Sequence, residues 1–340
     1  MTKKAKAYAR AGVDVDLGNR LKRQIQSLVK QTHGPQVLGK VGGFGGLFQA
    51  RFPGMRQPVL VASIDSVGTK LKIAFVLDKH DTVGADLVNH CVNDIAVLGA
   101  RPLFFLDYIG CERLERRMFQ ELLRGISRAC RSAGCALLGG ETAQLPGMYR
   151  PGEYDLAGCI VGVVERDKII DGKKIRPGDV ILGLESNGLH TNGYSLAREI
   201  LFGKMHLKVS SRVPGSTMIV GKELLRVHKN YQPLLTRIPS NVIKGLAHIT
   251  GGGLIDNLPR ILPPNCDAVI ETKNWRVPSI FQILQQNGDV DPQEMYQVFN
   301  MGIGMAAIVS QHDVEGVKAM LKAKRIGHIE RGIGRVRLKF

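Results

Sequence analysis

Three acidic residues stand where a divalent cation and a triphosphate would need ligands. Asp65 and Glu141 each follow an apolar run, 59–64 and 135–138, and each lies beside glycines. Asp94 falls in a segment that we expect to be helical. Carboxylate oxygens carried to strand ends beside glycine-rich turns suit Mg²⁺ and nucleotide phosphates. The three residues therefore predict a shared Mg²⁺ and ATP site.

Asp94 is unusual because it lies on the apolar stripe of its predicted helix. Within 82–98, Leu87 and Cys91 precede it at helical spacings of seven and three residues. An aspartate that faces the interior is costly unless it pairs with a base or binds a cation. A structural ion pair would satisfy Asp94 as well, so the other two carboxylates are what favour a ligand site.

The residues after Asp65 offer contacts to phosphate. Gly68, Thr69 and Lys70 resemble the end of a Walker motif, but the complete spacing occurs nowhere in the chain, which argues against a conventional P-loop. Thr69 can still donate a hydrogen bond to phosphate, and Lys70 can supply a positive charge. The plain alternative for Lys70 is a solvated surface lysine.

Two glycine-rich turns in the second half each carry a histidine. His190 lies in the segment 186–193, and His248 opens the segment 248–253. Backbone N–H groups, hydroxyls and an imidazole near the start of a helix favour an anion. A single histidine is usually structural, but two beside such turns indicate a site. Metal binding by them is disfavoured, because no other His or Cys lies at ligand spacing in the sequence.

The elements that must position these residues alternate between strand and helix, which indicates an α/β layer in the first half. There we expect strands at 58–64, 103–108, 135–138 and 157–165, and helices at 16–31, 82–98 and 112–133. The polar segment 167–179 is the expected boundary between a domain over 1–170 and a domain over 171–340. In the second domain we expect strands at 180–185, 243–249, 268–271, 305–309 and 332–338, and helices at 194–201, 221–236, 278–286 and 314–323.

Composition narrows the class of protein. The net charge of +17 over 340 residues suggests nucleic acid, yet the first 170 residues carry +8 (24 basic, 16 acidic) and the rest +9 (23 basic, 14 acidic). One Trp and seven Tyr are too few for a stacking platform. The six cysteines form no Cys-x-x-Cys pair, and no apolar run approaches a membrane span. We expect a cytoplasmic protein that binds neither nucleic acid nor membrane.

Ten short motifs, read in order, resemble those of one enzyme family. They occupy 12–16, 42–48, 65–70, 91–94, 102–108, 139–143, 146–149, 188–195, 248–253 and 300–305. Over essentially the whole chain they resemble phosphoribosylformylglycinamidine cyclo-ligase, also called aminoimidazole ribonucleotide synthetase. The resemblance implies ATP-dependent closure of formylglycinamidine ribonucleotide to aminoimidazole ribonucleotide, with Mg²⁺. It also implies an α/β first domain whose four-stranded sheet pairs across a homodimer, and an α+β second domain.

The resemblance also assigns roles to residues. Asp65, Asp94 and Glu141 would hold Mg²⁺ and the ATP phosphates, under a loop formed by Gly42, Gly43, Gly45 and Gly46 and with help from Gly68, Thr69, Lys70 and Asn93. The substrate side would be lined by His190, Asn192, Gly193, His248, Thr250, Gly251 and Gly252. His190 or His248 would move a proton, with Lys70 as a further catalytic group. Gln26 stands where members of the family often carry a lysine, which puts a role for that position in doubt.

Two other readings stay open at this stage. Selenophosphate synthetase and thiamine-monophosphate kinase share the superfamily, although no cysteine precedes Cys91 as the first of these would require. A basic RNA-binding protein is the remote alternative, and it would show salt-sensitive RNA retention without turnover.

Overall fold

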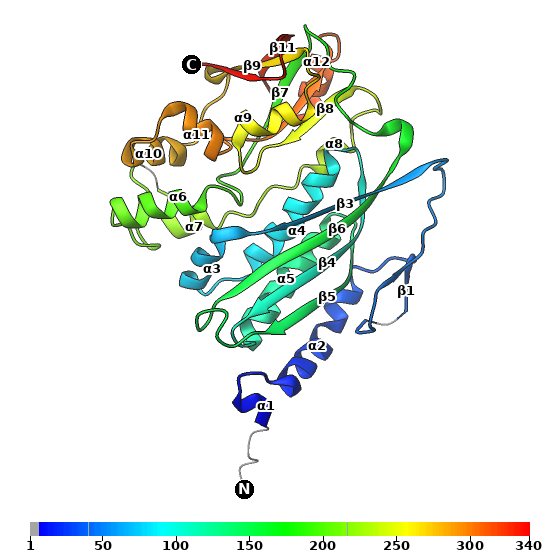
Figure 1. Cartoon of the computed structure of the whole chain (residues 1–340), viewed down its shortest axis with the longest axis vertical. Coiled ribbons are helices and arrows are strands. Elements are labelled where there is room, and N and C mark those ends of the chain that lie inside the picture. Colours follow the sequence, from blue (N-terminus) through cyan, green and yellow to red (C-terminus); the bar gives the residue numbers. More distant parts are fainter. Residues whose placement is uncertain (1–6, 40, 216) are drawn as a thin grey trace.

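Two β-sheets, one in each half of the chain, organise the fold (Figure 1). The computed structural model describes residues 7–39, 41–215 and 217–340. The first sheet contains four strands and the second contains six. A two-stranded ribbon, β1 (Val37–Leu38) with β2 (Leu47–Phe48), packs on the first sheet, where the ring centroids of Phe48 and Phe104 lie 5.2 Å apart. None of the described helices is long and apolar enough to cross a membrane.

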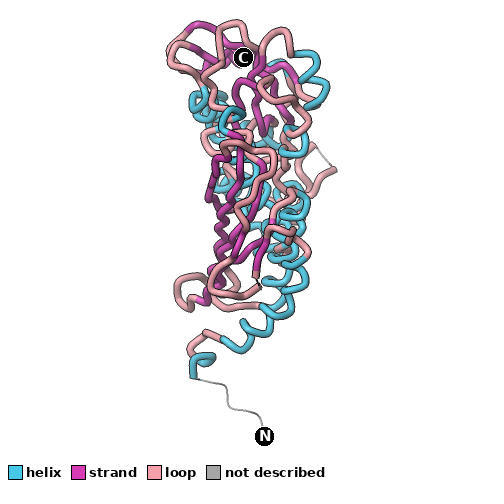
Figure 2. The backbone as a smooth tube through the Cα atoms, turned by 90° about the vertical axis from the view of Figure 1, so that its right-hand side faces the viewer, coloured by secondary structure: helices cyan, strands magenta, loops and turns pink. Residues whose placement is uncertain are grey.

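The first sheet has the strand order β3 (Pro58–Ser66), β6 (Tyr154–Glu165), β4 (Arg101–Cys111), β5 (Ala136–Gln144). Only β4 and β5 run parallel. Helices α2 (Val15–Lys30), α4 (Asp81–Ala96) and α5 (Arg116–Ser132) cover one face, so strands and helices form two layers in the side view (Figure 2).

The alternation of side chains on β3 explains this arrangement, because successive residues point to opposite faces. Val59, Val61 and Asp65 are turned toward the helices and are partly buried, whereas Leu60 and Ile64 are 62% and 72% exposed. At β3 the sheet therefore keeps a face that none of the described helices covers, and that face carries apolar side chains.

The second sheet has the order β12 (Val336–Lys339), β9 (Cys266–Glu271), β11 (Lys324–Arg331), β7 (Val180–Glu185), β10 (Ile303–Val309), β8 (Ile243–His248). The described helices of this half are α6 (Tyr194–Arg198), α7 (Val220–Leu224), α8 (Gln232–Leu235), α9 (Gly253–Asn257), α10 (Ser279–Gly288), α11 (Pro292–Val298) and α12 (Val314–Leu321). The remaining described α-helices are α1 (Ala7–Arg10) and α3 (Leu71–Leu77).

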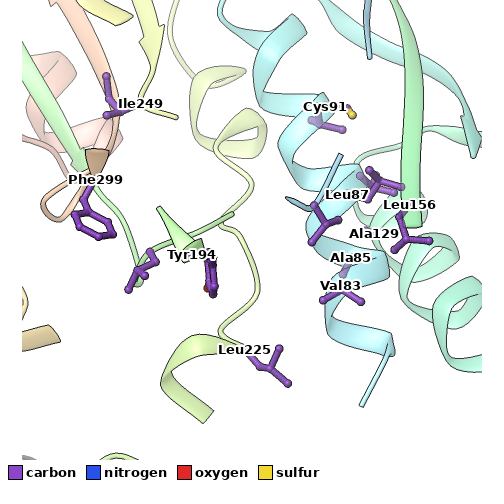
Figure 3. Close-up of a cluster of buried hydrophobic side chains, with 14 of the residues drawn as sticks. Val83, Ala85, Leu87, Cys91, Ala129, Leu156, Tyr194, Leu225, Ile249 and Phe299 are labelled. Carbon is purple, nitrogen blue, oxygen red and sulfur yellow. The ribbon is translucent and has the colours of Figure 1, made fainter. Parts of the chain in front are cut away.

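Helix α4 is the element that joins the two halves. Almost all of its residues are buried, because it packs on β3 and β6 on one side and touches α8 on the other. One apolar cluster includes Leu87 and Cys91 from α4 together with Tyr194 and Phe299 from the second half. Figure 3 shows both groups of side chains in that cluster. A buried connecting helix fixes the position of every polar group that it carries.

Two of the differences between the sequence expectations and the structure concern the second half. The helix expected at 221–236 is split into α7 and α8, and Pro233 lies in the first turn of α8, where a proline is tolerated but cannot continue an earlier helix. One strand was expected at 332–338, but only the short β12 lies there. The strand before it, β11, was not expected.

Candidate active site at the domain junction

Two of the three predicted acidic ligands lie together at the junction. Asp65 ends the helix-facing row of β3, and Asp94 lies near the end of α4. His90, one helical turn before Asp94, connects them, because its Nε2 lies 2.8 Å from Asp65 Oδ2 and 4.0 Å from Asp94 Oδ2. Ser63, two residues before Asp65 on the same face, donates from its Oγ to Asp94 Oδ2 at 3.1 Å.

The second half completes this cluster with three residues. His248, the last residue of β8, places Nδ1 2.8 Å from Asp94 Oδ1. Its Nε2 lies 3.0 Å from Nε2 of His228, and Nδ1 of His228 lies 3.3 Å from Oγ1 of Thr191. The same hydroxyl lies 2.8 Å from Nδ1 of His90. A continuous chain of polar contacts thus runs from Asp65 to Asp94 through both halves.

Burial controls the electrostatics of this chain. Loss of hydration lowers the pKa of His248, although the hydrogen bond that His248 donates to Asp94 opposes this shift. It lowers the pKa of His228 further. The pKa of His90 is raised instead, since its hydrogen bond to Asp65 and the charge of Asp94 outweigh desolvation. Burial alone would raise the pKa of Asp65, but the hydrogen bond and charge of His90 lower it.

Glu141 does not join the other two carboxylates within one chain. Asp65 pairs with Gly158, Gly158 with Asp107, and Asp107 with Gly140, so this row faces the helices. Glu141 is one residue beyond the row, and a shift of one residue turns a side chain to the other face. It is exposed, and its carboxylate bonds only to the adjacent N–H of Thr142 among the described contacts. The expectation that all three acids converge is therefore wrong for the single chain.

The glycine loop lies with Glu141 rather than with Asp65. It connects β1 and β2, and Gly46 approaches Leu138 of β5 so closely that a Cβ there would lie 2.3 Å from the leucine Cγ. Gly42 has φ +95°, a left-handed backbone that favours glycine. In the single chain this loop is exposed and does not close over Asp65.

Lys70 is placed differently from our expectation of a phosphate contact or a solvated surface group. Its side chain is fully buried, and Nζ lies 2.8 Å from Asp86 Oδ2 and within 3.0 Å of the carbonyl oxygens of His190 and Arg226. Burial raises the pKa of Asp86 and lowers that of Lys70, because both charges lose hydration, and their mutual attraction opposes both shifts. Lys70 is therefore an ionic link between the halves, and its buried Nζ is not placed to act as a catalytic residue or to contact a phosphate.

Two other expected ligand contacts are also used internally. The Asn93 amide donates to the carbonyl of Lys229 and accepts from the N–H of Tyr231, so it holds the second half in place. The His190 ring is buried and stacked on His228 with ring centroids 4.1 Å apart. The polar atoms of Asn93 are therefore occupied, whereas both ring nitrogens of His190 are buried and have no hydrogen-bond partner among the described residues.

The two glycine-rich turns meet each other, as a common substrate side requires. The Asn192 side chain lies against Gly251, where a Cβ would be 3.2 Å from its Oδ1. Gly193 and Gly252 have φ of +74° and +96° and stand directly before α6 and α9. Thr69 reaches the same region, with its Oγ1 3.1 Å from Oγ of Ser195, and Gly68 before it has φ +60°.

Sequence reasoning missed His90, Thr191 and His228. His90 had a usable signal, because it precedes Asp94 by four residues on a predicted helix and therefore shares its face. Thr191 adjoins the chosen His190. His228 had no signal, since it lies in a segment expected to be helical and reaches the site only through the tertiary fold.

The chain is similar to known proteins along nearly its whole length. The chain matches the family models described as "AIR synthase related protein, N-terminal domain" over residues 54–164 and "AIR synthase related protein, C-terminal domain" over 176–339. It is 50% identical to the phosphoribosylformylglycinamidine cyclo-ligase of Trichlorobacter lovleyi over 94% of this chain and 92% of that protein. It is 49% identical to that of Thermoanaerobacter sp. over 97% of each. The chain therefore belongs to the phosphoribosylformylglycinamidine cyclo-ligase family of enzymes.

Solved structures share the fold at low identity. Thiamine-monophosphate kinase from Stenotrophomonas maltophilia superposes with a TM-score of 0.67 at 16% identity and covers 96% of both chains. Hydrogenase maturation protein HypE in complex with ATP gives 0.65 at 19% identity, over 93% of this chain and 90% of that one. These likenesses establish the two-domain architecture.

Proposed function

We propose that this chain catalyses the ATP-dependent closure of formylglycinamidine ribonucleotide to aminoimidazole ribonucleotide, a step of purine synthesis, with release of ADP and phosphate. The observation that carries the proposal is about 50% identity to cyclo-ligases along nearly the whole chain. ATP as the co-substrate is supported by fold neighbours that were solved in complex with ATP and with AMPPCP. The kinase and selenophosphate synthetase readings are disfavoured, because the relatives about 50% identical along nearly the whole chain are cyclo-ligases, whereas the likeness to a kinase is one of fold at 16% identity.

The junction has the donors that Mg²⁺ needs. The carboxylates of Asp65 and Asp94 are 37% and 24% exposed, while the histidines behind them are buried. Partly exposed oxygen donors can share a hydrated cation with phosphates. We therefore assign Asp65 and Asp94 to the cation, which would neutralise the charge of the triphosphate when bound.

The chemistry requires activation of a poor leaving group. Transfer of the γ-phosphoryl group to the formyl oxygen makes that oxygen part of a phosphate ester, and ADP departs. The amidine nitrogen then attacks the same carbon, the C–O bond breaks, phosphate leaves and the nitrogen loses a proton. The protein must align two anionic ligands and exclude water. Asn192, Gly193, Thr250, Gly251 and Gly252 supply the turns that would hold the substrate.

His248 acts in this scheme as a positioning residue. Both of its ring nitrogens are engaged, one by Asp94 and one by His228, so direct proton transfer with substrate would require it to break a contact. Burial lowers the pKa of His248 and keeps the ring neutral near pH 7. A neutral imidazole that donates to Asp94 fixes the direction of its carboxylate without removing its charge.

The uncovered face of the first sheet supports a homodimer. Leu60 and Ile64 are exposed on this face, and Tyr108 and Glu141 pair across β4 and β5 on the same side. A second copy that covered this face would bury apolar surface and bring the glycine loop and Glu141 to the interface. Light scattering coupled to gel filtration should give about twice the monomer mass of 37.2 kDa, and Leu60→Glu should reduce it.

Turnover is the test of the proposed reaction. Purified protein incubated with ATP, Mg²⁺ and formylglycinamidine ribonucleotide should form ADP, phosphate and aminoimidazole ribonucleotide in equal amounts. Thiamine monophosphate and selenide serve as the competing acceptors. Phosphoryl transfer to either of them, without ring closure of the ribonucleotide, would contradict the proposal.

A further inference from the structure

We propose that the outer face of helices α2 and α5 is a docking surface for an acidic helix of another protein. The inner sides of these helices cover one face of the first sheet, and the proposed dimer contact uses the opposite face of that sheet (Figure 2). A second copy and an acidic partner can therefore bind at the same time. The inference goes beyond the proposed reaction, because ring closure makes no use of the outer face.

The positive charge of the first half is concentrated on these two helices. Helix α2 carries four basic residues and one acidic residue, and α5 carries five and one, so together they hold a net charge of +7. The first 170 residues carry +8, so the remainder of this half is almost neutral. The charge is even between the two halves of the sequence, but within the first half the fold gathers it in one place.

The two helices lie side by side and run in the same direction. Gln120 Nε2 of α5 donates to Gln24 Oε1 of α2 at 3.1 Å. Further along both helices, Arg131 Nη1 donates at 3.1 Å to Oε1 of Gln31, the residue that caps α2. The residue numbers of the partners rise together, so the helices are parallel. Neutral amides thus lie along the seam between the helices.

Basic side chains flank this seam, and several of them have no partner. Arg20 and Arg23 of α2 and Arg124 of α5 are exposed, and they make no hydrogen bond or ion pair with a described residue. The exposed residues of α5 are arginines except for Ser132. Like charges that lie close together repel one another, so this basic face gains from an acidic partner.

Carboxylates already bind along one side of the basic face. Arg117 Nε lies 3.1 Å from Glu121 Oε1, and its Nη1 lies 2.5 Å from Asp78 Oδ2. Arg128 Nη2 lies 3.4 Å from Asp81 Oδ2. The guanidinium group suits carboxylates because it offers several donors in one plane. An acidic helix would repeat such contacts along the seam, since glutamates three and four residues apart share one side of a helix.

Nucleic acid fits this surface less well. Each helix is about 10–12 Å across with its side chains, so two side by side are about 20 Å wide. The major groove of DNA is only about 12 Å wide. Single strands are commonly held by aromatic side chains on which the bases stack, and none of the exposed residues of α2 and α5 is aromatic. A third helix can lie along the seam without these restrictions.

Binding of a synthetic peptide tests the proposal. The probe is a labelled helical peptide as long as α5, 17 residues, with glutamate at every third or fourth position. Its control has glutamine at those positions. Fluorescence anisotropy with the full-length protein should show the glutamate peptide bound at least about tenfold more tightly at low salt, and added salt should weaken binding. Equal binding of the two peptides would overturn the proposal.

Variants locate the contact. Arg20→Gln/Arg124→Gln should weaken binding of the glutamate peptide by about fivefold or more. Arg276→Gln/Arg325→Gln is the matched control, because it removes the same charge from exposed positions of the second half, and it should weaken binding less than about twofold. Equal losses in the two variants would show a diffuse attraction and contradict the proposal.

A short RNA duplex distinguishes the other class of partner. If the duplex binds more tightly than the glutamate peptide and Arg20→Gln/Arg124→Gln abolishes that binding, the surface belongs to nucleic acid and the proposal is wrong. The substituted arginines are exposed, so melting temperature and turnover should equal those of the wild type. Failure of turnover in the wild type would affect only the proposed function.

Discussion

The domain junction and the far edge of the first sheet carry the same local signal with different outcomes. At both places a carboxylate follows an apolar run and has glycines nearby, at Asp65 and at Glu141. At the junction the carboxylate is tied to His90 and, through it, to the second half. At the edge Glu141 is exposed and bonds only to its neighbour among the described residues. The face of the sheet to which each carboxylate points depends on the strand register, which no local motif encodes. Asp65 therefore joins a buried site, and Glu141 lies on the surface.

Buried carboxylates show the same contrast between the two regions. At the junction, Asp86 faces the Lys70 ammonium and accepts from the N–H of His228. Next to the edge strand, Asp107 on β4 lies under Gly140, and its own backbone N–H is the hydrogen-bond donor to its carboxylate. Burial raises the pKa of Asp107 to about 7, and the charge of Glu141 adds to the rise. A buried cation and a backbone N–H offset the charge of Asp86, whereas only a backbone N–H offsets that of Asp107.

The largest effect on stability should come from breaking the ion pair between Lys70 and Asp86. Lys70→Met leaves Asp86 charged and unpaired in a dry interior, which should lower the free energy of unfolding by about 3–5 kcal/mol. Denaturant titration measures this loss. The double variant Lys70→Met/Asp86→Leu should recover most of it, because no charge remains buried. A single variant as stable as the wild type would show that the link is not needed.

Removal of the Asp107 carboxylate should raise the free energy of unfolding, the opposite of the effect of Lys70→Met. Since the folded pKa of Asp107 is about 7 and the unfolded value is near 3.9, the folded state holds more protons between these values, and stability falls as pH rises through them. Asp107→Asn should therefore be more stable than the wild type at pH 8, by at most about 4 kcal/mol. The difference should vanish near pH 4. Equal stability at both pH values would contradict an unpaired buried carboxylate.

Loss of a cation ligand should affect turnover more than stability. Asp94→Asn and Asp65→Asn should each lower kcat by at least about two orders of magnitude, because charge neutralisation at the phosphates is lost. Steady-state rates with saturating ATP measure this, and Asp171→Asn, which changes a surface aspartate paired with Lys173, is the control. An unchanged rate would remove that residue from the site.

Glu141→Gln should have the smallest effect, with kcat reduced less than about tenfold in a chain that acts alone. This substitution distinguishes two roles for Glu141. It is either a surface residue of the single chain or a residue that a second copy brings into the site. A loss as large as that of Asp94→Asn would show that a second copy carries Glu141 into the site. Repeating the assay with a monomeric Leu60→Glu variant would then decide between the two.

Strands that form apolar runs, and helices with an apolar stripe, were predictable from the sequence. Contacts between segments that are distant in the sequence were not. The strands 58–64 and 180–185 lie within β3 and β7, because both are continuous apolar runs bounded by turns. Asp94 was found because it interrupts an apolar helical stripe. The buried position of Lys70 depends on Asp86 and on two carbonyl groups of the second half, which lie more than a hundred residues away. His228 reaches the site in the same non-local way.

The most direct measurement is anomalous diffraction from crystals soaked with Mn²⁺ and a non-hydrolysable ATP analogue. The account predicts an anomalous peak at the domain junction, within bonding distance of Asp65 and Asp94, with the triphosphate beside it. A peak coordinated by Glu141 and the glycine loop of the same chain, with the junction empty, would contradict it.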